Sequence, residues 1–184
     1  MSKLLTLVAI VGMPGSGKSL AADFFRLQGI PVLRFGDQTD IGLEELGKER
    51  NEKNERWYRE HIRKELGMAA MAIKIEPRIR AMMNDQPLIT LDGLYSWEEY
   101  VYLKNKFPAL MLLCLWSPKH VRYERLSVRF VRPLTREEAQ SRDVAEIEQL
   151  HKGGPIAMAD YIIKNESDQA SLHKKLERFL QTIR

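Results

Sequence analysis

The sequence predicts an α/β protein in which five parallel strands form one sheet with helices on both faces. The apolar run at residues 4–11 is continuous, as in a strand that is buried on both sides of a parallel sheet. A glycine-rich turn follows it directly, and further short apolar runs alternate with helical segments. With 184 residues, 44% of them hydrophobic, residues 1–184 are expected to form a single domain with a substantial core.

The remaining strands are short apolar runs, expected at residues 32–35, 87–91, 110–116 and 161–163. Helices fill the gaps, and several carry signals for where they begin. Ser96 and Thr135 each precede a glutamate by three residues, which is the spacing of a capping box. Ser117 stands before a proline, which favours a helix that begins there.

Two connections are longer than an ordinary crossover, at about residues 41–84 and 119–153. Each follows the carboxyl end of a strand, where open α/β sheets build their ligand sites. We interpret both as substrate-handling inserts of one domain.

Composition excludes several classes of protein. Lys and Arg number 29 against 25 Asp and Glu, an excess that suits anionic ligands but is too small for an obligate nucleic-acid binder. The single cysteine, Cys114, excludes an internal disulfide framework and a multi-cysteine zinc cluster. No apolar run approaches the roughly 20 residues of a membrane span, and the first run lacks the flanks of a signal peptide, so we expect a cytoplasmic protein without a membrane partner.

Residues 12–19 match the pattern G-x-x-x-x-G-K-[ST] in full. Such a loop folds around a phosphate with its N–H groups pointing inward, and the dipole of the following helix, expected at residues 18–28, adds positive potential. Lys18 is expected to reach the β- and γ-phosphates of ATP, and the Ser19 hydroxyl to ligate Mg²⁺. The predicted nucleotide-binding residues of the loop are Gly12, Pro14, Gly15, Ser16, Gly17, Lys18 and Ser19.

The loop resembles that of adenylate kinase-like and dephospho-CoA kinase-like proteins, a branch of the P-loop nucleotide kinases. Gly36-Asp37 is similar to their GD-x-x-R element, Asp92-Gly93 to D-G-x-x-R, and Arg142-Asp143 to the R-x-D that follows a mobile lid. Residues 159–165 resemble the last strand and the adenine-flanking loop, which makes Asn165 a nucleotide-binding candidate. The resemblance implies a five-stranded parallel sheet, an acceptor-binding insert at about 41–84 and a lid at about 119–142.

The arginines of two family elements are missing, because Asp40 and Ser96 stand at their positions. In adenylate kinases both arginines hold the phosphate of the acceptor, so AMP is not assumed as the acceptor here. The possible replacements are Arg34, which precedes Gly36-Asp37, and the three arginines Arg56, Arg59 and Arg63 on one face of a helix expected at Glu52–Leu66. Ion pairs with glutamates four residues earlier explain two of the three, Arg56 and Arg59, equally well.

Two acidic residues are candidates for the reaction centre. Asp92 ends an apolar strand beside the phosphate loop, where a carboxylate can hold Mg²⁺. Asp37 follows the second strand and could accept a proton from an acceptor hydroxyl or orient the acceptor. A turn or capping role is the alternative for each.

The 119–142 region holds seven Lys or Arg against three Glu. Arg122, Arg125, Arg129 and Arg132 have the spacing of one helical stripe, and Pro133 is expected to end that helix. We interpret Arg129, Arg132 and Arg142 as catalytic residues that close over the transferring phosphoryl group. A solvated basic face or an RNA-binding patch is the alternative.

These observations together predict ATP-dependent phosphoryl transfer from Mg-ATP to a nucleotide or nucleotide-like small-molecule acceptor. The catalytic set is Lys18, Asp92, Arg129, Arg132 and Arg142. The alternative function is a P-loop ATP-binding switch or ATPase whose partner is a protein or RNA.

Overall fold

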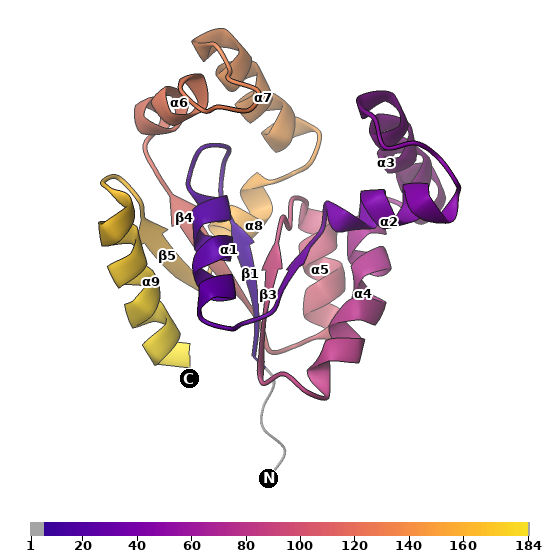
Figure 1. Ribbon diagram of the computed structural model, residues 1–184, viewed down its shortest axis with the longest axis horizontal. Helices are drawn as coiled ribbons and strands as arrows, with labels where there is room; N and C mark the ends of the chain where they lie inside the picture. The colour runs from indigo at the N-terminus through magenta and orange to yellow at the C-terminus, as the bar shows by residue number, and fades with distance from the viewer. Residues whose placement is uncertain (1–5, 184) are drawn as a thin grey trace.

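A computed structural model describes residues 6–183 of the chain. Five parallel strands form one sheet in the order β2-β3-β1-β4-β5, with helices on both faces (Figure 1). This confirms the predicted fold class. In chain order the elements are β1 (Thr6–Val11), α1 (Lys18–Leu27), β2 (Val32–Arg34), α2 (Asp37–Glu45), α3 (Glu52–Leu66), α4 (Ala70–Met83), β3 (Leu88–Asp92), α5 (Trp97–Lys106), β4 (Leu110–Trp116), α6 (Lys119–Ser127), α7 (Arg136–Glu148), α8 (Gly153–Ala157), β5 (Tyr161–Lys164) and α9 (Gln169–Ile183).

β1 is the middle strand and pairs with β3 on one side and β4 on the other. Its two faces pack into different layers. Val8 and Ile10 contact the layer of α1 and α9, whereas Leu7, Ala9 and Val11 contact the layer of α4 and α5 (Figure 1). All five side chains are fully buried, which explains why the run is continuously apolar.

The strands expected from the sequence are all present, and their ends within the described residues differ by at most one residue. Leu4 and Leu5 of the first expected strand lie outside the described residues. Both capping boxes are confirmed, because the hydroxyls of Ser96 and Thr135 accept from the backbone N–H of the glutamate three residues later. Ser117 is not the cap of α6: its hydroxyl donates to the backbone carbonyl of Asn165.

The expected arginine stripe on a single helix is wrong. α6 ends at Ser127, whose hydroxyl donates to the Glu124 carbonyl, one of the carbonyls that a helix end leaves unsatisfied. Arg132 has a left-handed backbone with φ 52°, and a residue before proline is disfavoured in the helical region. Arg129 and Arg132 therefore lie in the loop between α6 and α7.

The first long connection contains two different layers. α4 packs on the sheet beside α5, while α2 and α3 pack on each other and extend to one side of the sheet (Figure 1). α2 and α3 approach closely at Gly42, where an added Cβ would lie 2.0 Å from the Tyr58 ring. Within residues 6–183 no helix is both long and apolar enough to cross a membrane.

Candidate active site

The phosphate loop connects β1 to the first turn of α1. Gly12, Gly15 and Gly17 have φ values of 142°, 78° and 100°, a region that side-chain-bearing residues rarely adopt. An added Cβ would also lie 2.6 Å from the Arg122 carbonyl oxygen at Gly15, and 2.3 Å from the Asn165 amide nitrogen at Gly17. The glycines are therefore required by the shape of the loop and by what packs against it.

Lys18 is the first residue of α1, and its side chain folds back over the loop. Its ammonium donates to the backbone carbonyls of Gly12, at 2.8 Å, and Met13, at 3.0 Å. Burial lowers the pKa of Lys18 to about 7, and the positive charge of Lys152 adds to this effect. The ammonium thus lies at the phosphate-binding loop in a site where an anion would stabilise its charge.

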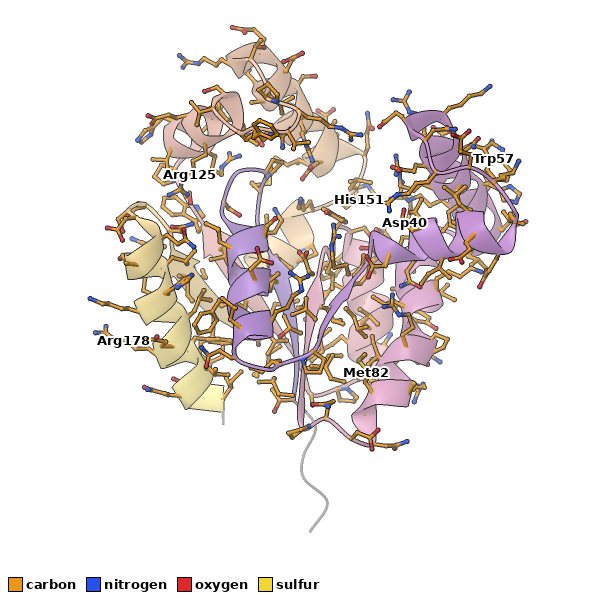
Figure 2. All side chains as sticks on the ribbon, viewed as in Figure 1. Asp40, Trp57, Met82, Arg125, His151 and Arg178 are labelled. Carbon is orange, nitrogen blue, oxygen red and sulfur yellow. The ribbon has the colours of Figure 1, made fainter. Side chains whose placement is uncertain are left out.

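Asn165 supports the loop from β5. Its buried side-chain amide donates to the Ser16 carbonyl at 2.9 Å. The backbone carbonyl of Asn165 accepts from the Ser117 hydroxyl and from the guanidinium of Arg125, the latter at 3.0 Å. Figure 2 shows Arg125 between α6 and the start of α9. This position agrees with the predicted adenine-flanking segment, but the side-chain amide of Asn165 is bound to the backbone of the loop. Contact of Asn165 with a nucleotide stays a prediction.

Arg122 links the loop to α7. Its guanidinium donates to both carboxylate oxygens of Asp143, at 2.9 and 2.6 Å, and to the Pro14 carbonyl at 3.0 Å. Both side chains are buried. Asp143 therefore supplies the counter-charge of Arg122, the first arginine of the expected stripe.

Asp92 is the last residue of β3 and lies beside Arg34, with 3.7 Å between its Oδ2 and Nε of Arg34. Burial raises its pKa, which the charges of Arg34 and Lys18 oppose. A second contact of Arg34 reaches Asp37, at 3.9 Å. Asp37 also lies 3.7 Å from Arg78, so its carboxylate has two cationic neighbours.

The residues available for Mg²⁺ are oxygen donors, namely the Asp92 carboxylate and the exposed Ser19 hydroxyl. Within residues 6–183 no group of three or more His, Cys, Asp or Glu could hold a metal by itself. Mg²⁺ commonly takes one or two protein oxygens together with substrate phosphates and waters. The donor set therefore fits a Mg²⁺ ion that arrives with a nucleotide.

A cavity of about 500 Å³ lies between the α2–α3 pair and α7. It is lined by Arg34, Phe35, Gly36, Thr39, Asp40, Arg50, Glu55, Arg59, Arg63, Met71, Tyr95, Arg132, Arg142, Glu146 and Leu150. Figure 2 shows Asp40 on α2, while Trp57 lies on the outer side of α3. Six arginines and three acidic residues give the cavity a positive balance.

Three of the four arginines that were predicted to bind the acceptor line the cavity, and the fourth does not. Arg34, Arg59 and Arg63 line the cavity, whereas Arg56 is exposed and lies 3.9 Å from Glu52. Arg59 is 3.5 Å from Glu55. Nε of Arg63 is buried and has no hydrogen-bond partner among the described residues, which leaves a donor at the cavity wall.

The three arginines assigned to the predicted lid also differ from one another. Arg132 and Arg142 line the cavity, and Arg129 does not, because its Nε donates to the Arg132 carbonyl. Arg132 reaches across to α3 and pairs with Glu52 at 3.0 Å. The 119–142 region and the α2–α3 insert therefore meet beside the cavity.

Sequence reasoning missed two buried residues near the loop, Lys152 and Glu146. Lys152 is 1% exposed, its ammonium donates to Glu146 Oε2, and it lies 4.6 Å from the Tyr95 ring centroid. Oε1 of the same glutamate accepts from Arg142 at 3.1 Å. The i, i+4 spacing could have suggested the Arg142–Glu146 pair, but no local pattern marks Lys152, which lies outside a helix.

Solved structures with this fold include several kinases. TT1252 from Thermus thermophilus superposes with a TM-score of 0.64 at 22% identity, over 98% of this chain and 97% of that one. A shikimate kinase from Bacteroides thetaiotaomicron gives 0.61 at 14% identity, over 97% and 98% of the two chains. A gluconokinase from Sinorhizobium meliloti gives 0.55 at 15% identity, over 98% and 97%. The fold is therefore that of the P-loop kinases.

Relatives by sequence span nearly the whole chain, although no family model matches it. A UPF0200 protein of Sulfurisphaera tokodaii is 33% identical over 183 residues, which is 98% of both chains. A UPF0200 protein of Pyrococcus horikoshii is 31% identical over 181 residues, covering 96% of this chain and 97% of the relative. At this identity and coverage the chain belongs to the UPF0200 family.

Proposed function

We propose that this protein transfers a phosphoryl group from Mg-ATP to a nucleotide or nucleotide-like small molecule. The observation that carries the proposal is that the cavity wall is tied to the phosphate loop. Arg142 lines the arginine-rich cavity, and its neighbour Asp143 is bound by Arg122, which also donates to the Pro14 carbonyl of the loop. A donor phosphate on the loop and an acceptor in the cavity would thus be neighbours.

On the donor side, the N–H groups of the loop and the N-terminus of α1 bind the ATP phosphates. Lys18 leaves its two backbone carbonyls and pairs with the β- and γ-phosphates. Ser19 and Asp92 would hold the Mg²⁺, which would neutralise charge that develops on the transferring group. Arg142, together with Arg132, approaches the transferring group from the cavity.

On the acceptor side, the cavity supports an anionic small molecule. Its volume of about 500 Å³ falls within the usual range for small-molecule sites. Asp40 and Glu55 are already paired with Arg50, at 2.9 and 3.7 Å. Arg63, whose Nε has no hydrogen-bond partner among the described residues, is then the wall cation with most capacity left for a phosphate, while Arg34 is shared with Asp92 and Asp37.

The structural relatives agree with this class of reaction. The shikimate kinase and the gluconokinase are, by their names, kinases of small molecules, and both share the whole fold. Their low identity supports the fold and leaves the acceptor of this chain to experiment.

The test is ADP release from ATP with and without a panel of acceptors: nucleoside monophosphates, their deoxy forms and dephospho-CoA. The proposal expects release that depends on one acceptor and a phosphorylated product. ADP release that no acceptor accelerates would instead support the ATPase or switch alternative. The Gly17→Ala variant is the matched control, because a Cβ at that position meets Asn165 and distorts the loop.

A further inference from the structure

One buried carboxylate at the site is shared by two cations. Oε1 of Glu146 accepts from Arg142, and Oε2 accepts from Lys152. Glu146 is 8% exposed, so its charge depends on these partners and not on water. The three side chains form an ion triad at the junction of the phosphate loop and the arginine-rich cavity.

The two cations of the triad differ in their freedom to move. The side chain of Arg142 is 46% exposed and lines the cavity. Lys152 is 1% exposed and lies over the Tyr95 ring, and its backbone N–H donates to the Glu146 carbonyl at 3.2 Å. Arg142 can therefore turn toward an anion in the cavity, whereas Lys152 stays with the carboxylate.

A buried carboxylate that loses its only counter-charge is strongly destabilising. If Arg142 were the sole partner of Glu146, any phosphate would have to compete with that cost. With Lys152 in place, Glu146 keeps one cation when Arg142 leaves.

We propose that Lys152 is a positioning residue: it keeps Glu146 neutralised while Arg142 exchanges this carboxylate for the transferring phosphoryl group. The role rests on the proposed function, because it assigns Arg142 to that group. Lys152 itself does not touch the nucleotide. Its contribution is to lower the cost of the exchange.

The electrostatics of the triad are consistent with this role. Burial lowers the pKa of Lys152, and Glu146 opposes that shift, so the carboxylate is what retains the charge on the lysine. Lys152 and Arg142 both lower the pKa of Lys18. Three cations thus share one region with Glu146 and Asp92, and an added anion relieves their repulsion.

The experiment compares ADP affinity with and without aluminium fluoride, a mimic of the transferring phosphoryl group, by titration calorimetry. The variants are Lys152→Met, the double Lys152→Met/Glu146→Gln, and Arg142→Ala. Lys106→Met is the matched control, because this exposed lysine also lies over a tyrosine, 5.7 Å from the Tyr102 ring, and is distant from the triad.

In the unchanged protein and in Lys106→Met, aluminium fluoride should tighten ADP binding. Lys152→Met should lose about tenfold or more of that gain, close to the loss in Arg142→Ala; tenfold corresponds to only about 1.4 kcal/mol. The double variant should recover to within about threefold, because Arg142 then has no buried carboxylate to abandon. ADP binding without aluminium fluoride should stay unchanged in Lys152→Met, because the proposed role concerns only the exchange; a purely structural lysine would weaken ADP binding in both conditions.

Three results overturn the proposal. The first is that aluminium fluoride tightens ADP binding as much in Lys152→Met as in the unchanged protein. The second is that it tightens ADP binding as little in the double variant as in Arg142→Ala. The third is that it does not tighten ADP binding in the unchanged protein. Should Lys152→Met fail to fold, the double variant against Arg142→Ala decides alone. Failure of the kinase proposal is separate: it appears as a protein that phosphorylates no acceptor, whatever the calorimetry gives.

Discussion

At the scale of single residues, the charge of Lys18 depends on what lies on the loop. In the structure its ammonium is bound to two carbonyl oxygens, and its pKa is lowered to about 7 from an ordinary value of 10.5. Bound phosphates add negative charge next to the amine and raise this pKa again. Nucleotide binding and protonation of Lys18 are therefore linked.

This linkage predicts that nucleotide binding takes up a proton in the window between pH 7 and about 10. Above pH 7 the free protein has largely lost the Lys18 proton, whereas the complex keeps it, so affinity should fall as pH rises through that window. Calorimetry at pH 8.5 in buffers of different ionisation enthalpy measures the uptake. It should approach one proton, and it should largely vanish in Lys18→Met. Equal uptake in both proteins would assign the proton to another group.

For turnover, Lys18→Ala and Asp92→Asn should each reduce kcat by about a hundredfold or more, because each removes a charge that acts on the transferring phosphates or their metal. Asp92→Asn should also raise the Mg²⁺ concentration needed for half-maximal rate. Steady-state kinetics at several Mg²⁺ concentrations checks both. An unchanged rate and metal dependence would remove that residue from the site.

The residues that sequence could predict are those whose role is local. Gly12 to Ser19 are contiguous, so their spacing alone indicates a phosphate loop, and Asp92 stands at the end of an apolar strand. Lys152 and Glu146 come near Lys18 only when the chain folds, because they are more than 120 positions away in the sequence. The spacing of residues along the sequence does not indicate this proximity.

At the scale of elements, α7 is attached to the phosphate loop by the buried Arg122–Asp143 pair. The pair joins α6 to α7 and reaches the Pro14 carbonyl, so the position of Arg142, the neighbour of Asp143, depends on it. α6 itself was expected to be longer, because arginine spacing indicates a face without indicating where a helix ends. The helix ends at Ser127, well before Pro133, and the Ser127 hydroxyl donates to the Glu124 carbonyl there.

We predict that Asp143→Asn lowers the free energy of unfolding by about 3–5 kcal/mol, since it leaves the Arg122 guanidinium buried without its counter-charge. Denaturant unfolding followed by circular dichroism measures the change. Asp23→Asn is the matched control: its pair with Arg26 is largely exposed and should contribute less than about 1 kcal/mol. Similar losses in both variants would mean that burial of the Arg122 pair is not what makes it important.

At the scale of the whole molecule, the cavity is assembled from segments distant in sequence. Arg34 is the last residue of the edge strand β2, Arg63 belongs to α3, and Arg142 belongs to α7 (Figure 1). The sequence predicted two inserts at the carboxyl ends of strands. It also predicted that residues other than the family's two arginines bind the acceptor phosphate. It could not select among Arg56, Arg59 and Arg63, because helical spacing places all three on nearly the same face.

The structure makes that selection testable through arginine-to-lysine variants. A guanidinium that binds a phosphate with two parallel hydrogen bonds is not replaced by an ammonium, which is a point charge without the fork geometry. Arg63→Lys should therefore raise the acceptor KM by about tenfold or more while the ATP KM stays unchanged. Arg59→Lys and Arg34→Lys should have smaller effects, because Glu55 holds part of the Arg59 guanidinium, and Asp92 and Asp37 lie beside that of Arg34.

Arg56→Lys is the control within the same helix, since Arg56 is exposed beside Glu52 and does not line the cavity. A surface ion pair of this kind contributes only a few tenths of a kcal/mol and tolerates lysine. Steady-state kinetics with the acceptor found active in the panel gives the acceptor KM and the ATP KM of all four variants. An acceptor KM that rises equally in Arg56→Lys and Arg63→Lys would show that the variants act through α3 as a whole. If the acceptor KM is unchanged in all four variants with an active acceptor, the acceptor phosphate is bound by other residues. Arg132 and Arg142, on the opposite wall, are the remaining candidate cations of the same cavity.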